Sequence, residues 1–480
     1  MNIKYLSLAK GFIFLAVLFL SGKSIAKSFP VDKQRLIVLT DIGNEPDDMQ
    51  SAIRLMLYSN VIDIEGLIAS TSIHQKEKVH PEILQRVVSA YGKVRKNLLL
   101  HASDFPKEEY LQSVIKSGLP AYGMEGVGKG KDSEGSNWII KALEKNDSRP
   151  LWITAWGGTS VLAQALFDLK ETKSAEELAR LIAKLRIYTI SDQDDAGYWI
   201  RSNFQDLFYI ASPGAYNEKT WSAINKVIPG IDNSEISNAW LRENIQQNNG
   251  PLGAVYPDVA FGMEGDTPSW LMLIPNGLNI PEHPEYGGWG GRYVLYTPKF
   301  DSSKSWIVPL KKEVRPFYSD VADVYTPFIS AVYGKEMIKD TITFEDNFAT
   351  LLRWRKDFQN DFAARIQWCT RTYKDANHPP IVKLKCPKII TVKSGETFIL
   401  NGESSYDPDG DSLSFLWFQY IEAGTYPKRI PSPTPENIAV QEIKAPKVTE
   451  PQTTHYILRV TDKGLPALTR YERVIVNIVP

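Results

Sequence analysis

The stretch RLIVLTDIGNEPDDMQS, residues 35–51, joins an apolar run to a cluster of acids. RLIVLT has the near-continuous apolar character of a strand that is buried on both faces of a parallel sheet. Gly43 permits a tight turn after that strand, and Pro46 suits the first turn of a helix, where its missing N–H costs nothing. Asp47 and Asp48 then lie near a helix N-terminus, whose dipole favours negative charge. The stretch therefore predicts a strand, a turn and a helix.

The acids of this stretch need an explanation beyond the helix dipole. Asp41, Glu45, Asp47 and Asp48 repel one another, and burial at a strand end makes that repulsion costly. Hard cations such as calcium bind several carboxylate oxygens together with a backbone carbonyl. Helix capping combined with a solvated acidic loop is the alternative without a metal. The stretch alone decides for neither.

From residue 35 to about residue 275, apolar strand patterns alternate with helical ones. This alternation indicates parallel βαβ units, hence an α/β domain with a mostly parallel sheet. Ligands of such sheets bind at the carboxyl ends of the strands, where we expect Asp41, Trp156 and Asp192. The predicted strands are 35–40, 63–71, 97–102, 150–156 and 186–192, and the predicted helices begin near Pro46 and cover 80–92, 157–169 and 177–185.

The rest of the chain changes character twice. Residues 276–300, rich in Pro, Gly and aromatic residues, predict a structured loop at the rim of a pocket, and residues 343–369 predict a helix that closes the first domain. After the HPP break at 378–380, short alternating strands separated by turns predict an all-β Ig-like sandwich. The predicted boundaries are 30–342 for the first domain, 343–377 for the closing helix and linker, and 378–480 for the sandwich.

The N-terminal segment has the pattern of a secretory signal peptide. Lys4 and Lys10 precede the apolar run GFIFLAVLFL, which is short for a membrane-spanning helix. We expect cleavage near Lys27 and a periplasmic or secreted protein with no stable membrane span. Without residues 1–26 the chain loses three lysines and no acid, so its formal charge falls from −1 to −4. No basic block stands out, which argues against nucleic acid as a partner.

Three further features are open or structural. Cys369 and Cys386 can form a disulfide in an oxidising compartment or remain separate thiols, and the sequence leaves both possible. DPDGD, residues 407–411, lacks the distal Glu of a calcium-binding EF-hand. We therefore favour an ordinary Asx turn over a calcium-binding loop by about two to one. Four histidines show no metal-ligand spacing, and we expect them to be structural: His74, His80, His101 and His283.

Several separated blocks resemble a known family. VLTDIGNEPDD resembles the Asp-rich motif that opens nucleoside hydrolases, although its first Asp is shifted or absent at Thr40 and two extra residues precede the Asp pair. TDIGNEPDD, ISDQDD, EGDTPS and EYGGWGGRY together resemble a secreted, nucleoside hydrolase-like family described as cellulose-binding, the Sde182 type. The resemblance covers essentially the whole mature chain. It implies a nucleoside hydrolase-like α/β domain followed by an Ig-like or PKD-like module.

The same resemblance implies a calcium site and roles for single residues. Asp41 is similar to the Asp that binds calcium and activates the attacking water. Asp48 resembles the second carboxylate ligand, and Asp47 its neighbour that touches a sugar hydroxyl. Trp156, which precedes the GG of ITAWGGTS, resembles the carbonyl ligand, and Asp266 resembles the last metal Asp.

The chain departs from nucleoside hydrolases at one position. Those enzymes carry a His before the last metal Asp that helps the leaving base depart, whereas this chain carries Gly265. Paired carboxylates serve acid/base work at a glycosidic bond, so we expect Glu264 or Asp192 to supply the missing acid. For the neighbouring Asp194 and Asp195, a helix N-cap is the competing interpretation.

Three other residues are candidates for sugar binding. Asn203 resembles a sugar-binding Asn of nucleoside hydrolases. In GGWGGR, Trp289 offers a platform for a sugar ring and Arg292 a donor. A Trp buried in a Gly-rich loop is the alternative for Trp289.

These observations predict a secreted, calcium-dependent hydrolase of glycosyl bonds in plant-type glycans or oligosaccharides. A second hypothesis is a non-catalytic protein that binds cellulose or another polysaccharide. A third is a periplasmic N-ribosyl nucleoside hydrolase, against which Gly265 argues.

Overall fold

The computed structural model describes residues 33–213, 219–299, 311–327, 342–432 and 437–480. Residues Lys33–Pro480 form one compact unit. The predicted signal segment lies outside the described residues. Within those ranges, no helix is both long and apolar enough to cross a membrane.

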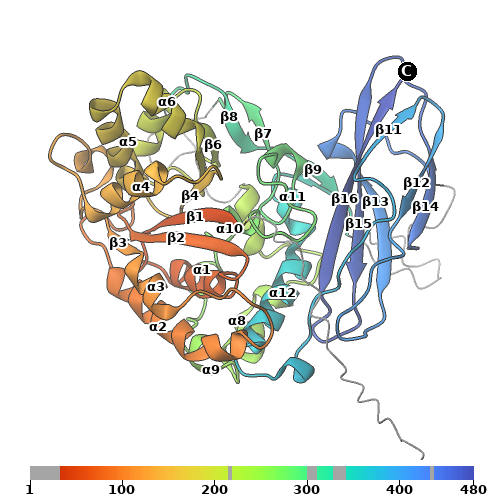
Figure 1. Cartoon of the computed structure of the whole chain (residues 1–480), viewed down its shortest axis with the longest axis horizontal. Coiled ribbons are helices and arrows are strands. Elements are labelled where there is room, and N and C mark those ends of the chain that lie inside the picture. Colours follow the sequence, from red (N-terminus) through yellow and green to blue (C-terminus); the bar gives the residue numbers. More distant parts are fainter. Residues whose placement is uncertain (1–32, 214–218, 300–310, 328–341, 433–436) are drawn as a thin grey trace, which may run out of the picture. The chain divides into compact units, whose positions relative to one another are not determined.

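A mostly parallel sheet forms the centre of the N-terminal part (Figure 1). Its strand order is β3-β2-β1-β4-β5-β6-β8-β7, and neighbouring strands run parallel except for the antiparallel pair β7 and β8. The predicted α/β class is therefore confirmed. The strands are β1 (Gln34–Thr40), β2 (Ile62–Ala69), β3 (Ile115–Ser117), β4 (Leu151–Ala155), β5 (Leu185–Thr189), β6 (Phe208–Ala211), β7 (Tyr293–Tyr296) and β8 (Phe317–Asp320).

Helices cover both faces of this sheet, and β1 shows why. Leu36 and Val38 belong to one apolar core, whereas Ile37 and Leu39 belong to the other. Successive strand residues point to opposite faces, so an almost wholly apolar strand needs a core on each side. The helices are α1 (Pro46–Met56), α2 (Pro81–Leu98), α3 (Glu108–Ser113), α4 (Glu134–Glu144), α5 (Ser160–Thr172), α6 (Ala175–Ala183), α7 (Ala196–Asn203), α8 (Asn238–Leu241), α9 (Gly250–Ala254), α10 (Pro268–Leu271), α11 (Ala349–Leu352) and α12 (Arg355–Gln367).

The strand order reverses direction between β1 and β4. The chain passes from β1 to β2 and β3 on one side, and then returns to place β4 on the other side of β1. At such a switch point the two connections diverge and leave a crevice at the carboxyl ends of the strands. Asp41 follows β1 and Trp156 follows β4, so the topology brings these two residues to that crevice.

Residues 97–102 are not the strand that we predict from NLLLHA. Helix α2 continues to Leu98, and the edge strand is β3 instead. Leu98 is buried on the face of α2 that also buries Val94, but Leu99 and Leu100 are exposed. The leucine run therefore continues a helical pattern and does not have the burial of a strand.

The segment 343–369 is not one helix. It contains β10 (Phe344–Asp346), α11 and α12, and β10 pairs antiparallel with β9 (Asp323–Tyr325). A break at Arg353 and Trp354 separates the two helices. There Trp354 is buried and the Arg353 guanidinium donates to the Val324 carbonyl. These tertiary contacts outweigh the helical pattern of the sequence.

The C-terminal part is a β-sandwich, as predicted. One sheet has the order β11-β16-β15-β13, and β12 and β14 form the other. In the DPDGD segment, the backbone N–H groups of Asp409 and Asp411 donate to Asp407 Oδ1, which makes the segment an Asx turn. Cys369 and Cys386 are free thiols. The strands are β11 (Ile389–Lys393), β12 (Thr397–Asn401), β13 (Ser414–Tyr420), β14 (Val440–Lys444), β15 (Gln452–Thr461) and β16 (Thr469–Val479).

Ion pairs between buried acids of α12 and partly exposed arginines of the sandwich join the two parts. Asp357 pairs with Arg459 of β15 and also accepts from the Tyr471 hydroxyl of β16. Asp361 pairs with Arg470 at 2.7 Å. Removing one partner of a buried pair leaves the other charge uncompensated, so these contacts hold the two parts together.

The Gly-rich loop after residue 276 forms a second contact between the α/β part and the sandwich, here called the second joint. It is not the pocket rim that we predict. Arg473 of β16 donates to the carbonyls of Leu278 and Gly287 at 3.1 Å and 2.8 Å. A Cβ at Gly277 would lie 1.8 Å from the Tyr471 carbonyl oxygen, so this position must be glycine. Arg473 also donates to Nδ1 of the buried His455 at 3.0 Å.

His455 gives this second joint a dependence on pH. Burial and the Arg473 charge lower the pKa of His455 to about 3. In the unfolded chain its pKa is about 6.5, so between these values the unfolded state binds more protons and stability falls as pH falls. We expect His455→Gln, which keeps an acceptor but does not titrate, to reduce this slope by up to about 1.4 kcal/mol per pH unit. Urea unfolding from pH 7 to pH 4 measures it, and equal slopes for the two proteins would contradict the prediction.

Candidate functional site

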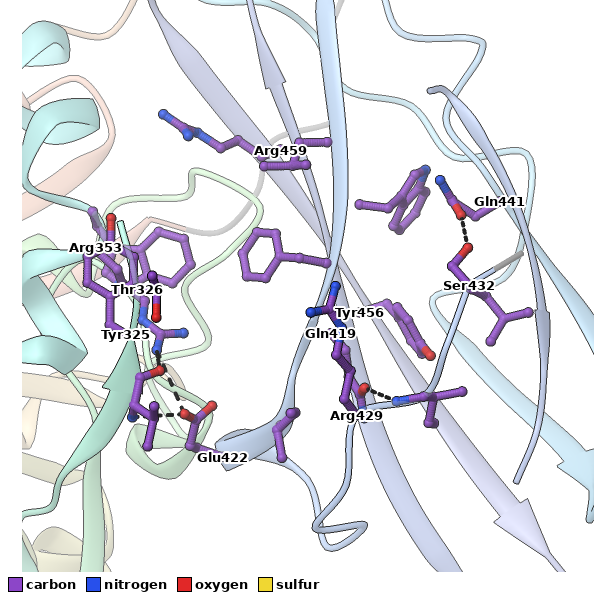
Figure 2. A pocket seen from close by; sticks show the side chains of 18 residues that line it. Tyr325, Thr326, Arg353, Gln419, Glu422, Arg429, Ser432, Gln441, Tyr456 and Arg459 are labelled. Carbon is purple, nitrogen blue, oxygen red and sulfur yellow. Dashed lines mark hydrogen bonds and ion pairs between the residues drawn. The ribbon is translucent and has the colours of Figure 1, made fainter. Parts of the chain in front are cut away.

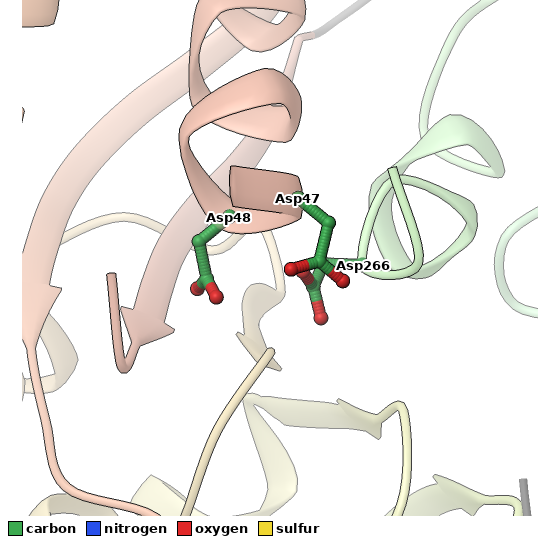
Figure 3. A group of neighbouring side chains, drawn as sticks. All are labelled: Asp47, Asp48 and Asp266. Carbon is green, nitrogen blue, oxygen red and sulfur yellow. The ribbon is translucent and has the colours of Figure 1, made fainter. Parts of the chain in front are cut away.

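Four acids meet at the crevice between β1 and β4. Asp41 follows β1, and Asp47 and Asp48 lie in the first turn of α1. Asp266 approaches from the segment before α10 (Figure 3). Oxygen atoms of Asp47, Asp48 and Asp266 lie within 4.8 Å of one another. Two of the predicted metal-binding carboxylates, Asp48 and Asp266, belong to this group although they lie more than 200 residues apart in the sequence. The third, Asp41, lines the same cavity but is not in the group, whereas Asp47, which we predict to contact a sugar, is.

A local contact fixes Asp48. The Thr40 hydroxyl donates to Asp48 Oδ1 and accepts from the backbone N–H of Ile42 at 3.1 Å. Thr40 therefore ties the end of β1 to the start of α1. Glu45, the N-cap residue of α1, makes no side-chain capping bond, and it lines the cavity.

The paired glycines after β4 allow the close approach of backbone and carboxylates. A Cβ at Gly157 would lie 2.5 Å from Asp41 Oδ1. A Cβ at Gly158 would lie 2.3 Å from Asp194 Oδ2 and 2.7 Å from the Thr71 carbonyl oxygen. Non-bonded carbon and oxygen atoms do not pack so closely, and only glycine fits either position.

A cavity of about 560 Å³ contains these acids. Its volume lies in the range of small-molecule sites. His74, Trp221, Asn225 and Lys226 also line it, together with Phe261, whose side chain is 90% exposed. The cavity therefore combines an acidic cluster with aromatic and hydrogen-bonding surface.

Burial and mutual repulsion raise the pKa values of these carboxyl groups. Burial, with the charges of Asp41 and Asp47, raises the pKa of Asp48 well above its ordinary value, and burial with the charge of Asp48 does the same for Asp266. Burial, with Glu45 and Asp41, raises the pKa of Asp47 to about 7. The pKa of Asp41 is also raised, chiefly by burial, although hydrogen bonding to Ser72 opposes this.

The donor set fits a hard divalent cation. Among the described residues, no Lys, Arg or His forms an ion pair with Asp41, Asp47, Asp48 or Asp266. Asp266 Oδ2 is buried and has no hydrogen-bond partner there. Several carboxylate oxygens in one place are the ligands that calcium prefers, and a cation would remove their repulsion.

Trp156, the predicted carbonyl ligand, lines the same cavity. Its carbonyl accepts a hydrogen bond from Gln193 Nε2 at 2.6 Å, and a carbonyl oxygen has a second lone pair. The block SDQDD thus reaches the cavity through Gln193. The role of Trp156 as a metal ligand stays a prediction.

The acids of that block face elsewhere. Asp192 pairs with Arg201 at 2.7 Å and does not line the cavity, which contradicts its predicted catalytic role. Asp194 accepts from the backbone N–H groups of Thr159 and Ala196, so it holds the starts of α5 and α7 together. Asp195 accepts from the Met124 N–H and makes no capping bond to α7.

Glu264 also lies outside the cavity lining, and its predicted role as the leaving-group acid is corrected. It is fully buried, pairs with Arg54 at 2.6 Å and accepts from the Tyr256 hydroxyl at 2.7 Å. Its backbone φ is +50°, a strained value for a residue with a side chain. These contacts hold the turn that presents Asp266.

The three other predicted sugar-binding residues have structural contacts as well. Asn203 accepts from Lys170 Nζ at the surface, away from the cavity. Trp289 is completely buried, with its ring edge-on to Phe358, so it cannot stack on a sugar. Arg292 is buried in an ion pair with Asp323 at 2.6 Å. The alternative of a buried Trp in a Gly-rich loop is therefore correct.

Sequence reasoning missed His74, which lines the cavity and which we expected to be structural. It follows the carboxyl end of β2, next to β1 in the sheet. The strand-end rule that identified Asp41 applies equally to His74 and would have found it. For Trp221 and Asn225, which follow no strand end directly, the sequence offered no such signal.

A doubly wound parallel sheet with acids at its switch point is typical of an α/β protein that binds its ligand at the carboxyl ends of the strands. Residues 35–293 match the model for the nucleoside hydrolase-like domain of cellulose-binding Sde182, and residues 397–478 match that for the C-terminal domain of cellulose-binding protein Sde0182. The chain belongs to this family.

A solved structure agrees with the family assignment. It is described as a nucleoside hydrolase-related hypothetical protein from Saccharophagus degradans that is associated with carbohydrate metabolism. It is 34% identical, the match covers 93% of this chain and all of that chain, and the TM-score is 0.75. The effector protein XOO4466 matches at 10% identity over 71% of this chain and 94% of that one, with a TM-score of 0.34 that supports no inference. No curated protein matches the chain.

The contacts of Glu264 predict a loss of stability on mutation. Glu264→Gln leaves the buried Arg54 guanidinium without its counter-ion, so we expect the free energy of unfolding to fall by about 3–5 kcal/mol. Glu82→Gln, which removes an exposed pair with His80, is the control, with an expected change within about 0.5 kcal/mol. Chemical denaturation measures both. Unchanged stability of Glu264→Gln would contradict the structural role.

Proposed function

We propose that the acidic cavity hydrolyses a glycosyl bond of a plant-type glycan or oligosaccharide with the help of a divalent cation. The observation that carries this proposal is the convergence of the half-buried Asp47 with the buried Asp48 and Asp266, none of which forms an ion pair with a Lys, Arg or His among the described residues. Like charges so placed are costly for the fold. A site that concentrates such a cost is a candidate for function.

Asp41, Asp48, Asp266 and the Trp156 carbonyl would hold the cation, and calcium is the cation that an all-oxygen donor set favours. When bound, it supplies positive charge that attracts the vicinal hydroxyls of a sugar and lowers the pKa of water. Asp47, which lines the cavity, accepts a hydrogen bond from a sugar hydroxyl in this proposal. These assignments use only residues that line the cavity.

In this proposal Asp41 and His74 perform the proton transfers. Asp41, which lines the cavity, accepts the proton of the attacking water. His74, which also lines the cavity, donates a proton to the leaving oxygen in place of the residue missing at Gly265. Because water attacks the anomeric carbon directly, the product has inverted configuration.

A non-catalytic polysaccharide-binding function is the second candidate, and two observations favour it. The family description is cellulose-binding. Asp192 and Glu264, the acids expected from the sequence, do not line the cavity. In this case the same cavity grips sugar hydroxyls without cleaving a bond. Either function fits the periplasmic or secreted location that the N-terminal segment predicts.

Hydrolysis of nucleosides is a third and weaker candidate. The position that carries the base-activating His in nucleoside hydrolases is Gly265 here, so no side chain at this position can protonate a leaving base.

The cation proposal predicts opposite effects of one mutation with and without metal. In chelator, Asp266→Asn removes a buried like charge, and we expect the variant to be more stable than the wild type. With calcium at about 100 times its dissociation constant, the wild type gains about 2.7 kcal/mol and the variant gains far less. Thermal unfolding with and without calcium measures both, with Asp206→Asn, an exposed acid, as control. Equal calcium responses would contradict the proposal.

The hydrolase proposal predicts release of reducing sugar from glycans by the purified chain. The substrates are plant cell-wall polysaccharides, cello-oligosaccharides, aryl glycosides and ribonucleosides, each with calcium or chelator. We expect Asp41→Asn to lower the rate by about 10²- to 10⁴-fold because it removes the proton acceptor, and Asp206→Asn to leave it unchanged. No release from any substrate by a protein that still binds calcium would favour the binding function.

A further inference from the structure

An amide oxygen of a residue that lines the acidic cavity has no partner. Gln193 is 8% exposed, and its Nε2 donates to the Trp156 carbonyl at 2.6 Å. Only the nitrogen end of an amide can donate to a carbonyl, so this contact fixes which end of the side chain is the oxygen. That oxygen, Oε1, is buried and has no hydrogen-bond partner among the described residues. An acceptor buried in this way destabilises the fold unless a donor or a cation satisfies it.

A second buried oxygen of the same cavity is in the same situation. Asp266 Oδ2 also has no partner in the part of the chain that the structure describes. An oxygen of Asp266 lies within 4.8 Å of oxygens of Asp47 and Asp48. Both unpartnered atoms are acceptors, so the group that they lack is a hydrogen-bond donor or a cation. The surplus of carboxylates around them favours the cation.

The hydrogen bond to Trp156 limits the position of Gln193 Oε1. The oxygen and nitrogen of a planar amide are about 2.2 Å apart, so Oε1 lies within about 4.8 Å of the Trp156 carbonyl oxygen. Two oxygen ligands of one calcium ion lie at most about 5 Å apart, which is twice the length of a Ca–O bond. The two oxygens are therefore close enough to bind the same ion.

The Trp156 carbonyl is in turn close to two of the acids. A Cβ at Gly157 would lie 2.5 Å from Asp41 Oδ1, so the peptide that carries the Trp156 carbonyl lies against the Asp41 carboxylate. The Trp156 ring donates to Ser269 Oγ at 3.0 Å, and this hydroxyl donates to the Asp266 carbonyl at 2.7 Å. Gln193 is thus connected through one residue to both acids.

The backbone of Gln193 is also held in place. Its carbonyl accepts from the Ile73 N–H at 2.8 Å, which ties the segment after β5 to the segment after β2. A side chain that is fixed at both ends loses little conformational freedom when it binds an ion.

The space around β13 offers no comparable cation site. Arg353, Arg429 and Arg459 line it, and Glu422 is the one acid among its described lining residues (Figure 2). The Glu422 carboxylate already accepts from the Val324 N–H at 3.0 Å and lies 3.9 Å from the Arg353 guanidinium. Three guanidinium charges repel a cation.

From these contacts we infer that Gln193 Oε1 is a further ligand of the cation and that the site prefers calcium to magnesium. The inference rests on the cation site of the proposed function. Calcium accepts roughly six to eight oxygen ligands, amide oxygens included, whereas magnesium demands a strict octahedron and keeps several waters. A neutral amide oxygen adds a ligand without adding to the repulsion among the acids.

Titration calorimetry of the purified chain with calcium alone, and separately with magnesium, tests the inference. Gln193→Met has a similar length but no oxygen, and we expect it to weaken calcium binding by at least about tenfold. Gln193→Glu returns an oxygen but, when ionised, cannot donate to the Trp156 carbonyl, and we expect it to bind calcium at least as tightly as the wild type. Gln112→Met is the matched control, because Gln112 of α3 donates to the Gln85 carbonyl and does not line the cavity.

Four outcomes would contradict the inference. Equal calcium affinity of Gln193→Met and the wild type would show that Gln193 is not a ligand. Equally weakened binding in Gln193→Met and Gln193→Glu would show that Gln193 only holds the Trp156 carbonyl. Magnesium binding as tight as calcium binding would contradict the preference. Full calcium binding by Asp266→Asn would place the ion elsewhere in the chain.

Failure of the proposed cation site itself gives a different result, because the wild type then binds no calcium at all. That result would overturn the inference as well. Thermal unfolding in chelator shows whether each variant folds. If Gln193→Met does not fold, Gln193→Asn replaces it, because its amide is withdrawn by one carbon–carbon bond and the same loss of calcium binding is expected.

Discussion

Repulsion among carboxylates in one poorly solvated cavity is the constraint on which the α/β part depends. Asp41, Asp48 and Asp266 are almost completely buried, and none of them forms an ion pair with a Lys, Arg or His among the described residues. The surrounding structure holds them in place: Thr40 fixes Asp48, the paired glycines give Asp41 its space, and the Glu264–Arg54 pair anchors the turn before Asp266. The repulsion among these acids destabilises the fold, and the two apolar cores and the buried ion pairs offset that cost.

The sequence predicts the strands, turns and helices that a local pattern of residues specifies. The apolar run before Asp41, the turn at Gly43 and the proline at the start of α1 specify the strand, the turn and the helix, and the strand-end rule then places Asp41 and Trp156 correctly. It fails where a distant partner decides the role of a side chain. Glu264 and Arg54 lie 210 residues apart, and nothing near Glu264 shows that it is paired. Trp289 is similar, because rings distant in the sequence, Phe358 of α12 and Tyr471 of β16, pack against it.

The acidic cavity has excess negative charge and suits a cation with a polyhydroxylated ligand. Its lining comes from the α/β part, and none of the described residues that line it belongs to the sandwich. The sandwich contacts the α/β part elsewhere, at α12 and at the Gly-rich loop after residue 276.

The ion pairs between α12 and the last two strands make this protein a poor source of separable modules. Asp357 and Asp361 are buried, and their partners Arg459 and Arg470 come from the final 22 residues of the chain. Cutting the chain before the sandwich would leave two carboxylates and a Gly-rich loop facing water or each other. Separating the two parts, by recombination in evolution or by truncation in the laboratory, would break these ion pairs in either case. The sequence boundary near residue 378 separates two folds, but it does not separate two independent proteins.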